Sequence, residues 1–101
     1  MDPGQPDMIS IADVVEATAG REQGKIFYVI REDDTYLYLV NGKDRTLDKP
    51  KRKKRKHVKQ VLRSETRVAA KLISGDKVLN SELRRDLAEF SQKMQSNNLG
   101  G

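Results

Sequence analysis

The chain has 101 residues, enough for one compact domain, with 36% hydrophobic and 35% charged residues and no cysteine. The lack of cysteine excludes a disulfide framework and thiolate metal sites, and it is typical of a reducing compartment. The apolar runs are far shorter than the roughly twenty residues that span a bilayer, and no signal-peptide pattern is present. We therefore expect a soluble, cytoplasmic protein.

The net charge of +5 is unevenly distributed. The segment 43–63 contains eleven Lys and Arg residues and two acidic residues, a local charge of +9, whereas the rest of the chain has nine basic and thirteen acidic residues, which is −4. In its densest part, 49–57, seven of nine residues are cationic. A compact positive patch on a mildly acidic body is the electrostatic footprint of a polyanion binder.

The amino-terminal part of the chain predicts a lead-in, a strand and a loop. Residues 1–8 contain two prolines and a glycine without periodicity, and we expect them to be disordered. The β-branched residues in 13–17 predict the first strand. The next segment contains Gly20 and Gly24 among charged residues, which predicts a loop whose backbone turns through positive φ.

Further strands are predicted in close succession. The second covers 25–31, and the third covers 36–40 with leucines on one face and tyrosines on the other. The Asn-Gly pair at 41–42 is typical of a tight hairpin, so a fourth strand is predicted near 43–47. The basic run 49–57 is then expected to be an extended or poorly ordered arm, because like charges repel and Pro50 disfavours a central strand.

A fifth strand is predicted over 57–62, pairing back on the first. Short strands between residues 9 and 62, joined by tight turns without room for crossover helices, predict a small antiparallel barrel. The domain prediction is thus a mainly β domain at 9–62, a two-helix appendage at 63–95 and a disordered tail at 96–101.

The two predicted helices differ in their signals. The first is expected to be capped by Ser64, to end at Gly75 and to include Ile73 in its apolar side. The second is expected to begin at Asn80 or Ser81. Its apolar residues recur at helical spacing and must pack on the first helix, on the barrel or on a partner. This stripe consists of Leu83, Leu87, Phe90 and Met94.

Several motifs follow one another in a fixed order between residues 9 and 62. They are Ala19-Gly20-Arg21-x-x-Gly24-Lys25, Asn41-Gly42-Lys43-Asp44-Arg45, Lys49-Pro50-Lys51-Arg52-Lys53 and Lys56-His57. The first resembles the KOW motif of ribosomal and transcription-associated proteins. The ordered set resembles the fourteen-e branch of large-subunit ribosomal proteins and, more closely, the small bacterial KOW-domain RNA-binding proteins related to it. The resemblance implies an SH3-like barrel that binds RNA, with ribosomal RNA or the ribosome as the expected partner.

The chain departs from the general KOW pattern at three positions. Gln23 stands where a basic residue precedes the second glycine, Phe27 stands where a glycine is usual, and Ala12 stands where a glycine is common. The departure at Phe27 is shared with the fourteen-e branch, so it favours that branch over the transcription-associated one.

The physical chemistry of the two segments also indicates RNA contact. A glycine loop lets backbone N–H groups approach a phosphate, and Arg holds phosphate through two hydrogen bonds. Structured RNA is recognised largely by shape and backbone. The expected turn-forming residues are Gly20, Gly24 and Gly42. The expected RNA-binding residues are Arg21, Lys25, Lys43, Arg45, Lys51, Arg52, Lys53, Lys54, Arg55, Lys56, His57 and Lys59.

Other functions were weighed against RNA binding. The run 50–56 resembles a nuclear import signal, although it lies between two β segments. A protein-interaction module docking through the helical stripe, and a DNA-bending protein, are further alternatives. Tyr36, Tyr38 and Phe27 either stack on unpaired bases or pack within the domain. His57 is the only histidine, and no catalytic dyad or metal-ligand spacing is present, so we expect no enzyme, cofactor or metal.

Overall fold

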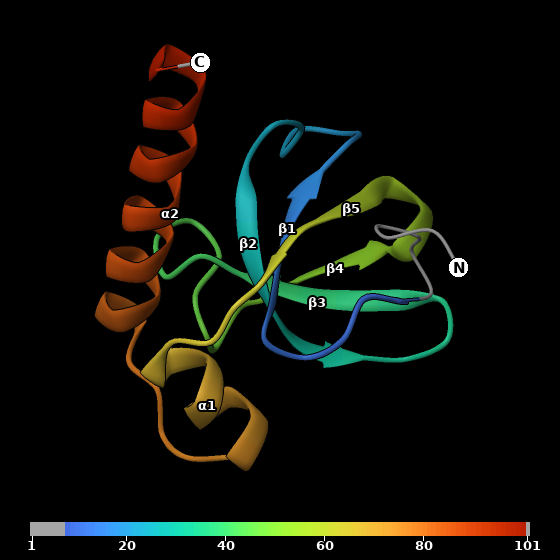
Figure 1. Ribbon diagram of the computed structural model, residues 1–101. Coiled ribbons are helices and arrows are strands. Elements are labelled where there is room, and N and C mark those ends of the chain that lie inside the picture. The colour runs from blue at the N-terminus through green and yellow to red at the C-terminus, as the bar shows by residue number, and fades with distance from the viewer. Residues whose placement is uncertain (1–7, 101) are drawn as a thin grey trace.

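The computed structural model describes the backbone of residues 8–100 and the side chains of 8–94, so the predicted lead-in lies outside it except for Met8. Five strands form one antiparallel sheet with the order β4-β3-β2-β1-β5, and two helices follow (Figure 1). The strands are β1 (Asp13–Ala17), β2 (Ile26–Glu32), β3 (Tyr36–Val40), β4 (Lys51–Lys54) and β5 (Val58–Arg63). The helical elements are the 3-10 turn η2 (Arg55–His57), α1 (Arg67–Ser74) and α2 (Asn80–Gly100).

The expected antiparallel sheet with carboxy-terminal helices is confirmed, and so is the pairing of the last strand with the first. Ala17 of β1 lies opposite Val58 of β5. The two edge strands, β4 and β5, are joined by the three residues of η2, so the sheet must curl strongly. Between β4 and β5 themselves, the described residues form no ladder.

The prediction of the fourth strand was wrong. Residues 43–47 form turns, and β4 lies inside the basic run instead. The N–H groups of Asn41 and Gly42 both donate to the Arg45 carbonyl oxygen, at 2.8 and 3.0 Å. The Asn41 side chain accepts hydrogen bonds from the N–H groups of Lys43 and Arg45. The Asn-Gly pair therefore closes a local turn within the long β3–β4 connection and is not the two-residue turn of a tight hairpin.

This turn is anchored on the beginning of α2. The Arg84 guanidinium donates to the Gly42 carbonyl oxygen at 2.6 Å, and the Leu47 N–H donates to the Asn80 side chain at 2.9 Å. Gly42 has φ +76°, and a Cβ there would collide with the Asn80 carbonyl oxygen. Asn80 thus holds a loop, in addition to starting a helix.

Apolar residues fill both faces of the curled sheet because side chains alternate along each strand. One cluster lies on the concave side: Ile9, Val15, Ala17, Phe27, Val29, Leu37, Leu39 and Val58. The other lies under the helices and includes Val14, Tyr28, Val40, Val68, Ala69, Leu83 and Leu87. α2 stands beside β2 and away from β4 (Figure 1). At the outward positions of β3 and β4, Tyr36 and Tyr38 are half-buried, and Arg52 and Lys54 are exposed.

The first helix has a different cap from the one predicted. The Thr66 hydroxyl accepts a hydrogen bond from the Ala69 N–H at 3.2 Å, the role expected of Ser64. Gly75 ends the helix in the left-handed conformation with φ +82°, as expected. Ile73 is 69% exposed, so it does not belong to the apolar face. α2 continues through 96–100, where a disordered tail was predicted.

A buried tyrosine links the sheet to both helices. The Tyr28 hydroxyl donates to Asp86 at 2.8 Å and lies 2.8 Å from the Ser64 hydroxyl. The Thr66 hydroxyl donates to the same carboxylate at 2.6 Å. Burial raises the pKa of Tyr28 to about 12, so the phenol stays a hydrogen-bond donor at every physiological pH. Ser64 belongs to this network, and Thr66, which directly precedes α1, both belongs to it and caps the helix.

Candidate nucleic-acid interface

Residues 51–54 of the basic run form an ordered edge strand, so this part of the run is extended, the first of the two expected states, and is not poorly ordered. Along β4, Lys51 and Lys53 lie opposite Leu39 and Leu37, whereas Arg52 lies opposite Tyr38. Alternation therefore divides the run between two faces. Pro50 immediately precedes the strand, a position that proline tolerates at a sheet edge.

The glycine loop lies against this strand. Gly20 has φ +80°, and a Cβ at Gly20 would lie 3.0 Å from the Lys53 ammonium nitrogen. Gly24 has φ +89°, and its N–H donates to the Ala17 carbonyl oxygen at 2.9 Å. The expected positive φ is thus present at both glycines. The loop and the basic run are therefore adjacent in the fold.

The loop uses part of its hydrogen-bonding capacity internally. The N–H groups of Gln23, Gly24 and Lys25 donate to carbonyl oxygens of the loop or of β1. By contrast, the N–H groups of 19–22 donate to no residue in the described part of the chain. Any backbone contact with a phosphate therefore belongs to 19–22, at the beginning of the loop.

Glu22 organises the contact between loop and strand, and the sequence analysis did not identify it. Its side chain is only 9% exposed and accepts a hydrogen bond from Arg45 at 2.9 Å, while Lys53 lies 3.7 Å away. The Arg45 hydrogen bond lowers the pKa of Glu22 despite its burial, and the charges of Lys51 and Lys53 act in the same direction. The ion pair explains how the Lys53 side chain can be 9% exposed.

Arg55 holds η2 in place through several hydrogen bonds. Its guanidinium donates to the carbonyl oxygens of Asp33 and Ile9 at 2.8 and 3.1 Å, and to the Glu32 carboxylate at 3.2 Å. Its backbone N–H donates to the Thr35 carbonyl oxygen. These contacts hold η2 against the β2–β3 turn, so Arg55 differs from the exposed cations around it.

Two other predicted cations pair with carboxylates at the surface. Lys25 forms an ion pair with Asp44 at 2.7 Å, and Lys59 lies 3.9 Å from Glu16. Exposed pairs of this kind contribute at most about 1 kcal/mol, so they exchange readily for a phosphate. The Lys25 pair lies beside a cavity of about 420 Å³ between the loops and α2, which Lys43 also lines.

His57 is half-buried, and its carbonyl oxygen accepts a hydrogen bond from the Thr18 N–H at 2.8 Å. Its backbone therefore holds the start of the glycine-loop segment beside η2. The imidazole itself has no partner among the described residues.

The remaining predicted cations are available to an external ligand. Lys43 is exposed, and in the described part of the chain it forms no ion pair. Five further cations on or near β4 also form no ion pair in the described part of the chain. Of these, Lys51 is half-buried and the other four are exposed. We call this second set the cationic edge: Arg21, Lys51, Arg52, Lys54 and Lys56.

The helical stripe packs inward. Leu83 is fully buried and Leu87 is 5% exposed, both within the cluster under the helices. Phe90 is half-buried and meets Tyr28 edge-on at 6.4 Å between ring centroids. Met94 is half-buried beside the cavity that Lys25 lines. The stripe therefore covers the sheet, and little of it is exposed.

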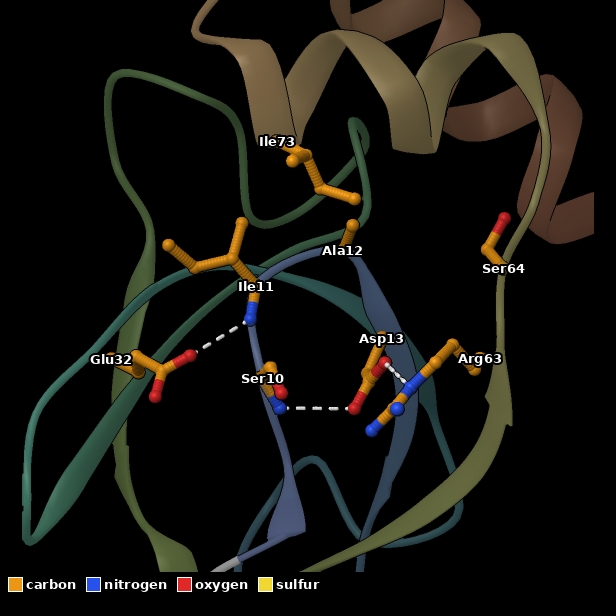
Figure 2. A pocket seen from close by; sticks show the side chains of 8 residues that line it. All are labelled: Ser10, Ile11, Ala12, Asp13, Glu32, Arg63, Ser64 and Ile73. Carbon is orange, nitrogen blue, oxygen red and sulfur yellow. Dashed lines mark hydrogen bonds and ion pairs between the residues drawn. The ribbon is translucent and has the colours of Figure 1, made fainter.

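A second cavity, of about 360 Å³, lies at the opposite end of β1 (Figure 2). Its most buried polar group, Asp13, accepts hydrogen bonds from the Ser10 N–H at 2.9 Å, from Gln60 at 2.8 Å and from Arg63 at 3.2 Å. Glu32 accepts one from the Ile11 N–H at 2.9 Å. Both carboxylates are thus satisfied by hydrogen bonds within the fold.

No family model matches the sequence, and no curated protein matches it. No three His, Cys, Asp or Glu side chains gather into a possible metal site among residues 8–94. Within the described part of the chain, neither helix combines the length and apolar character needed to cross a membrane.

Proposed function

We propose that this protein binds structured RNA, with ribosomal RNA as the target class, through the cationic edge and the adjoining glycine loop. The observation that carries this proposal is the contact between the loop and β4, seen at Gly20, Glu22 and Lys53. That contact joins two separate positive segments into one surface. A phosphate backbone lying on it would release counterions, which is the main source of affinity for nucleic acid.

We also propose that the curled sheet is an SH3-like barrel of the KOW type. The resemblance in the sequence supports this, and so does the positive φ at Gly20 and Gly24. Ala12 provides further support, because it has φ +74° where related motifs commonly have glycine. A left-handed position selects glycine, so the backbone explains the family preference at that site.

A charged edge strand has another use, since lysine on an edge prevents pairing with a second sheet. That requirement concerns only β4. It does not account for Arg21 in the loop or for Lys56 in η2, both exposed and without an ion pair in the described part of the chain. RNA binding accounts for the charges on and off the strand together.

The test uses two triple variants with equal change in net charge. R52Q/K54Q/K56Q removes exposed cations of the cationic edge and leaves Lys53 and Arg55 in their structural contacts. R67Q/K77Q/R85Q removes exposed cations around the helices and is the matched control. Affinity for a folded ribosomal RNA fragment is measured by fluorescence anisotropy, and association with ribosomal subunits by sedimentation.

The first variant is expected to lose RNA and subunit binding, and the control to retain them. Equal affinities of the two variants for the RNA would contradict a localised site. They would show instead that binding depends only on the net charge of the protein. Thermal unfolding of both variants establishes that any loss comes from the surface.

A further inference from the structure

The outward face of β2, β3 and β4 carries alternating cations and aromatic rings. In one cross-strand row, Tyr38 lies between Arg31 on β2 and Arg52 on β4. In the next row, Tyr36 lies opposite Lys54. α2 lies beside β2 and away from β4 (Figure 1), and the residues of these two rows are half-buried or exposed. Tyr38 therefore has a cation on each side, and Tyr36 has one on its β4 side.

The tyrosine rings here are not committed to the core. Both are half-buried, and their hydroxyl groups have no hydrogen-bond partner among the described residues. Arg52 lies over the Tyr36 ring, with 4.4 Å between its guanidinium carbon and the ring centroid, and Arg31 lies 5.4 Å from the Tyr38 centroid. Tyr28, by contrast, is fully buried and bonded to Asp86.

The cations of this face are also uncommitted. Arg31, Arg52 and Lys54 are exposed, and none forms an ion pair with a described residue. A guanidinium is weakly hydrated and stacks on an aromatic face without losing its ability to bind phosphate. The acidic turn 32–34 borders the face at the Tyr36 end, so a phosphate backbone is favoured along the cationic rows and disfavoured beyond that turn.

We propose that this face binds unpaired bases of the RNA, an inference that rests on the proposed function and specifies its ligand. Bases stack on Tyr36 and Tyr38, while Arg31, Arg52 and Lys54 bind the neighbouring phosphates. Bases within a duplex are already stacked on each other, whereas those of loops and bulges can lie on an aromatic side chain. The protein thereby holds structured RNA at a position where single-stranded nucleotides emerge.

The test compares two single-stranded probes of equal length and charge, an oligoadenylate and an oligonucleotide without bases. The wild-type protein is expected to bind the oligoadenylate about tenfold more tightly, because stacking of one base has at least that order of effect. Y36L/Y38L is expected to bind both probes with equal affinity. Y36F/Y38F, which keeps the rings, is expected to retain the preference.

A second readout needs no variant. The chain has three tyrosines and no tryptophan, so its intrinsic fluorescence reports tyrosine stacking directly. Oligoadenylate is expected to quench this emission, and the probe without bases is expected to leave it unchanged. An unquenched emission, or a preference for oligoadenylate that survives in Y36L/Y38L, would overturn the stacking proposal while phosphate binding stands. Failure of the wild-type protein to bind either probe would overturn single-strand binding at this face, whereas the folded ribosomal RNA fragment tests the proposed function separately.

Discussion

Glu22 helps determine which members of the basic run face solvent. Arg45 and Lys53 both converge on its carboxylate, so these two cations stabilise the loop and are withdrawn from the surface. Arg55 pairs with Glu32 instead, and the five cations of the cationic edge form no ion pair in the described part of the chain. At the level of single residues, two carboxylates therefore withdraw members of the basic run from the surface: Glu22 pairs with Lys53, and Glu32 pairs with Arg55.

The contribution of Glu22 to stability is expected to depend on pH. Its pKa in the folded protein lies below the usual 4.5, so its stabilisation is present above pH 4.5 and is lost as the pH falls through the folded-state value. We expect E22Q to lower the free energy of unfolding by about 1–3 kcal/mol at neutral pH. Urea unfolding should show this difference shrinking below pH 4.5.

Other carboxylates with lowered pKa values, such as Asp33 and Glu82, are present in both proteins and cancel in this comparison. A difference between wild type and E22Q that does not change with pH would contradict the role given to the Glu22 ion pairs.

Single residues show what the sequence could not reveal. An acidic residue between two glycines, as Glu22 is, has the local pattern of a solvated loop residue, and only the fold brings Arg45 and Lys53 to it. Phe27 was considered for base stacking, but it is fully buried. The positive φ of Ala12 was not predicted, although its position, where similar motifs commonly have glycine, offered a signal for it.

Among the elements, the strands with apolar alternation were predictable and β4 was not. β1, β3 and β5 follow from their own residues, as does the end of α1 at Gly75. β4 consists entirely of Lys and Arg, which have no intrinsic preference for a strand. It forms because β3 offers a free edge and because Glu22 compensates the charge of Lys53. Both conditions arise from the tertiary structure, so the local sequence of β4 does not indicate them.

The turn at 41–47 is expected to be sensitive to its contact with α2. Gly42 and Gly24 both have positive φ, so alanine at either position costs about 1–2 kcal/mol of backbone strain. A Cβ at Gly24 meets no atom within 4 Å, whereas one at Gly42 collides with the Asn80 backbone. We expect G42A to be less stable than G24A by a further 1–3 kcal/mol or so in urea unfolding.

Equal destabilisation by the two alanine substitutions would show that the turn does not dock on α2. The pair is matched, since both changes add one methyl group to a glycine in the same backbone region.

The helical stripe is expected to be part of the core. Leu83 is fully buried, so L83A should lower the free energy of unfolding by about 2–5 kcal/mol. Ile73 is 69% exposed, and I73A should change the free energy of unfolding by less than about 0.5 kcal/mol. Chemical denaturation monitored by circular dichroism measures both. If L83A were as stable as I73A, α2 would be free of the sheet and available to a partner.

For the whole molecule, the distribution of charge matters more than its total. A net charge of +5 on 101 residues would give modest general attraction to nucleic acid. The fold places the cationic edge on one strand and its neighbouring segments, while the acidic residues lie elsewhere or pair with individual cations. The sequence predicted this asymmetry, but the division between structural and exposed cations required the three-dimensional pairing of β4 with β3.

The salt dependence of RNA binding tests the central claim most directly. The logarithm of the association constant for the ribosomal RNA fragment is plotted against the logarithm of salt concentration, for the wild-type protein and both triple variants. Each lost phosphate contact lowers the slope by about 0.7–0.9. We predict a slope shallower by about 2 for R52Q/K54Q/K56Q and an unchanged slope for R67Q/K77Q/R85Q. Identical slopes for the two variants would contradict RNA binding at the cationic edge.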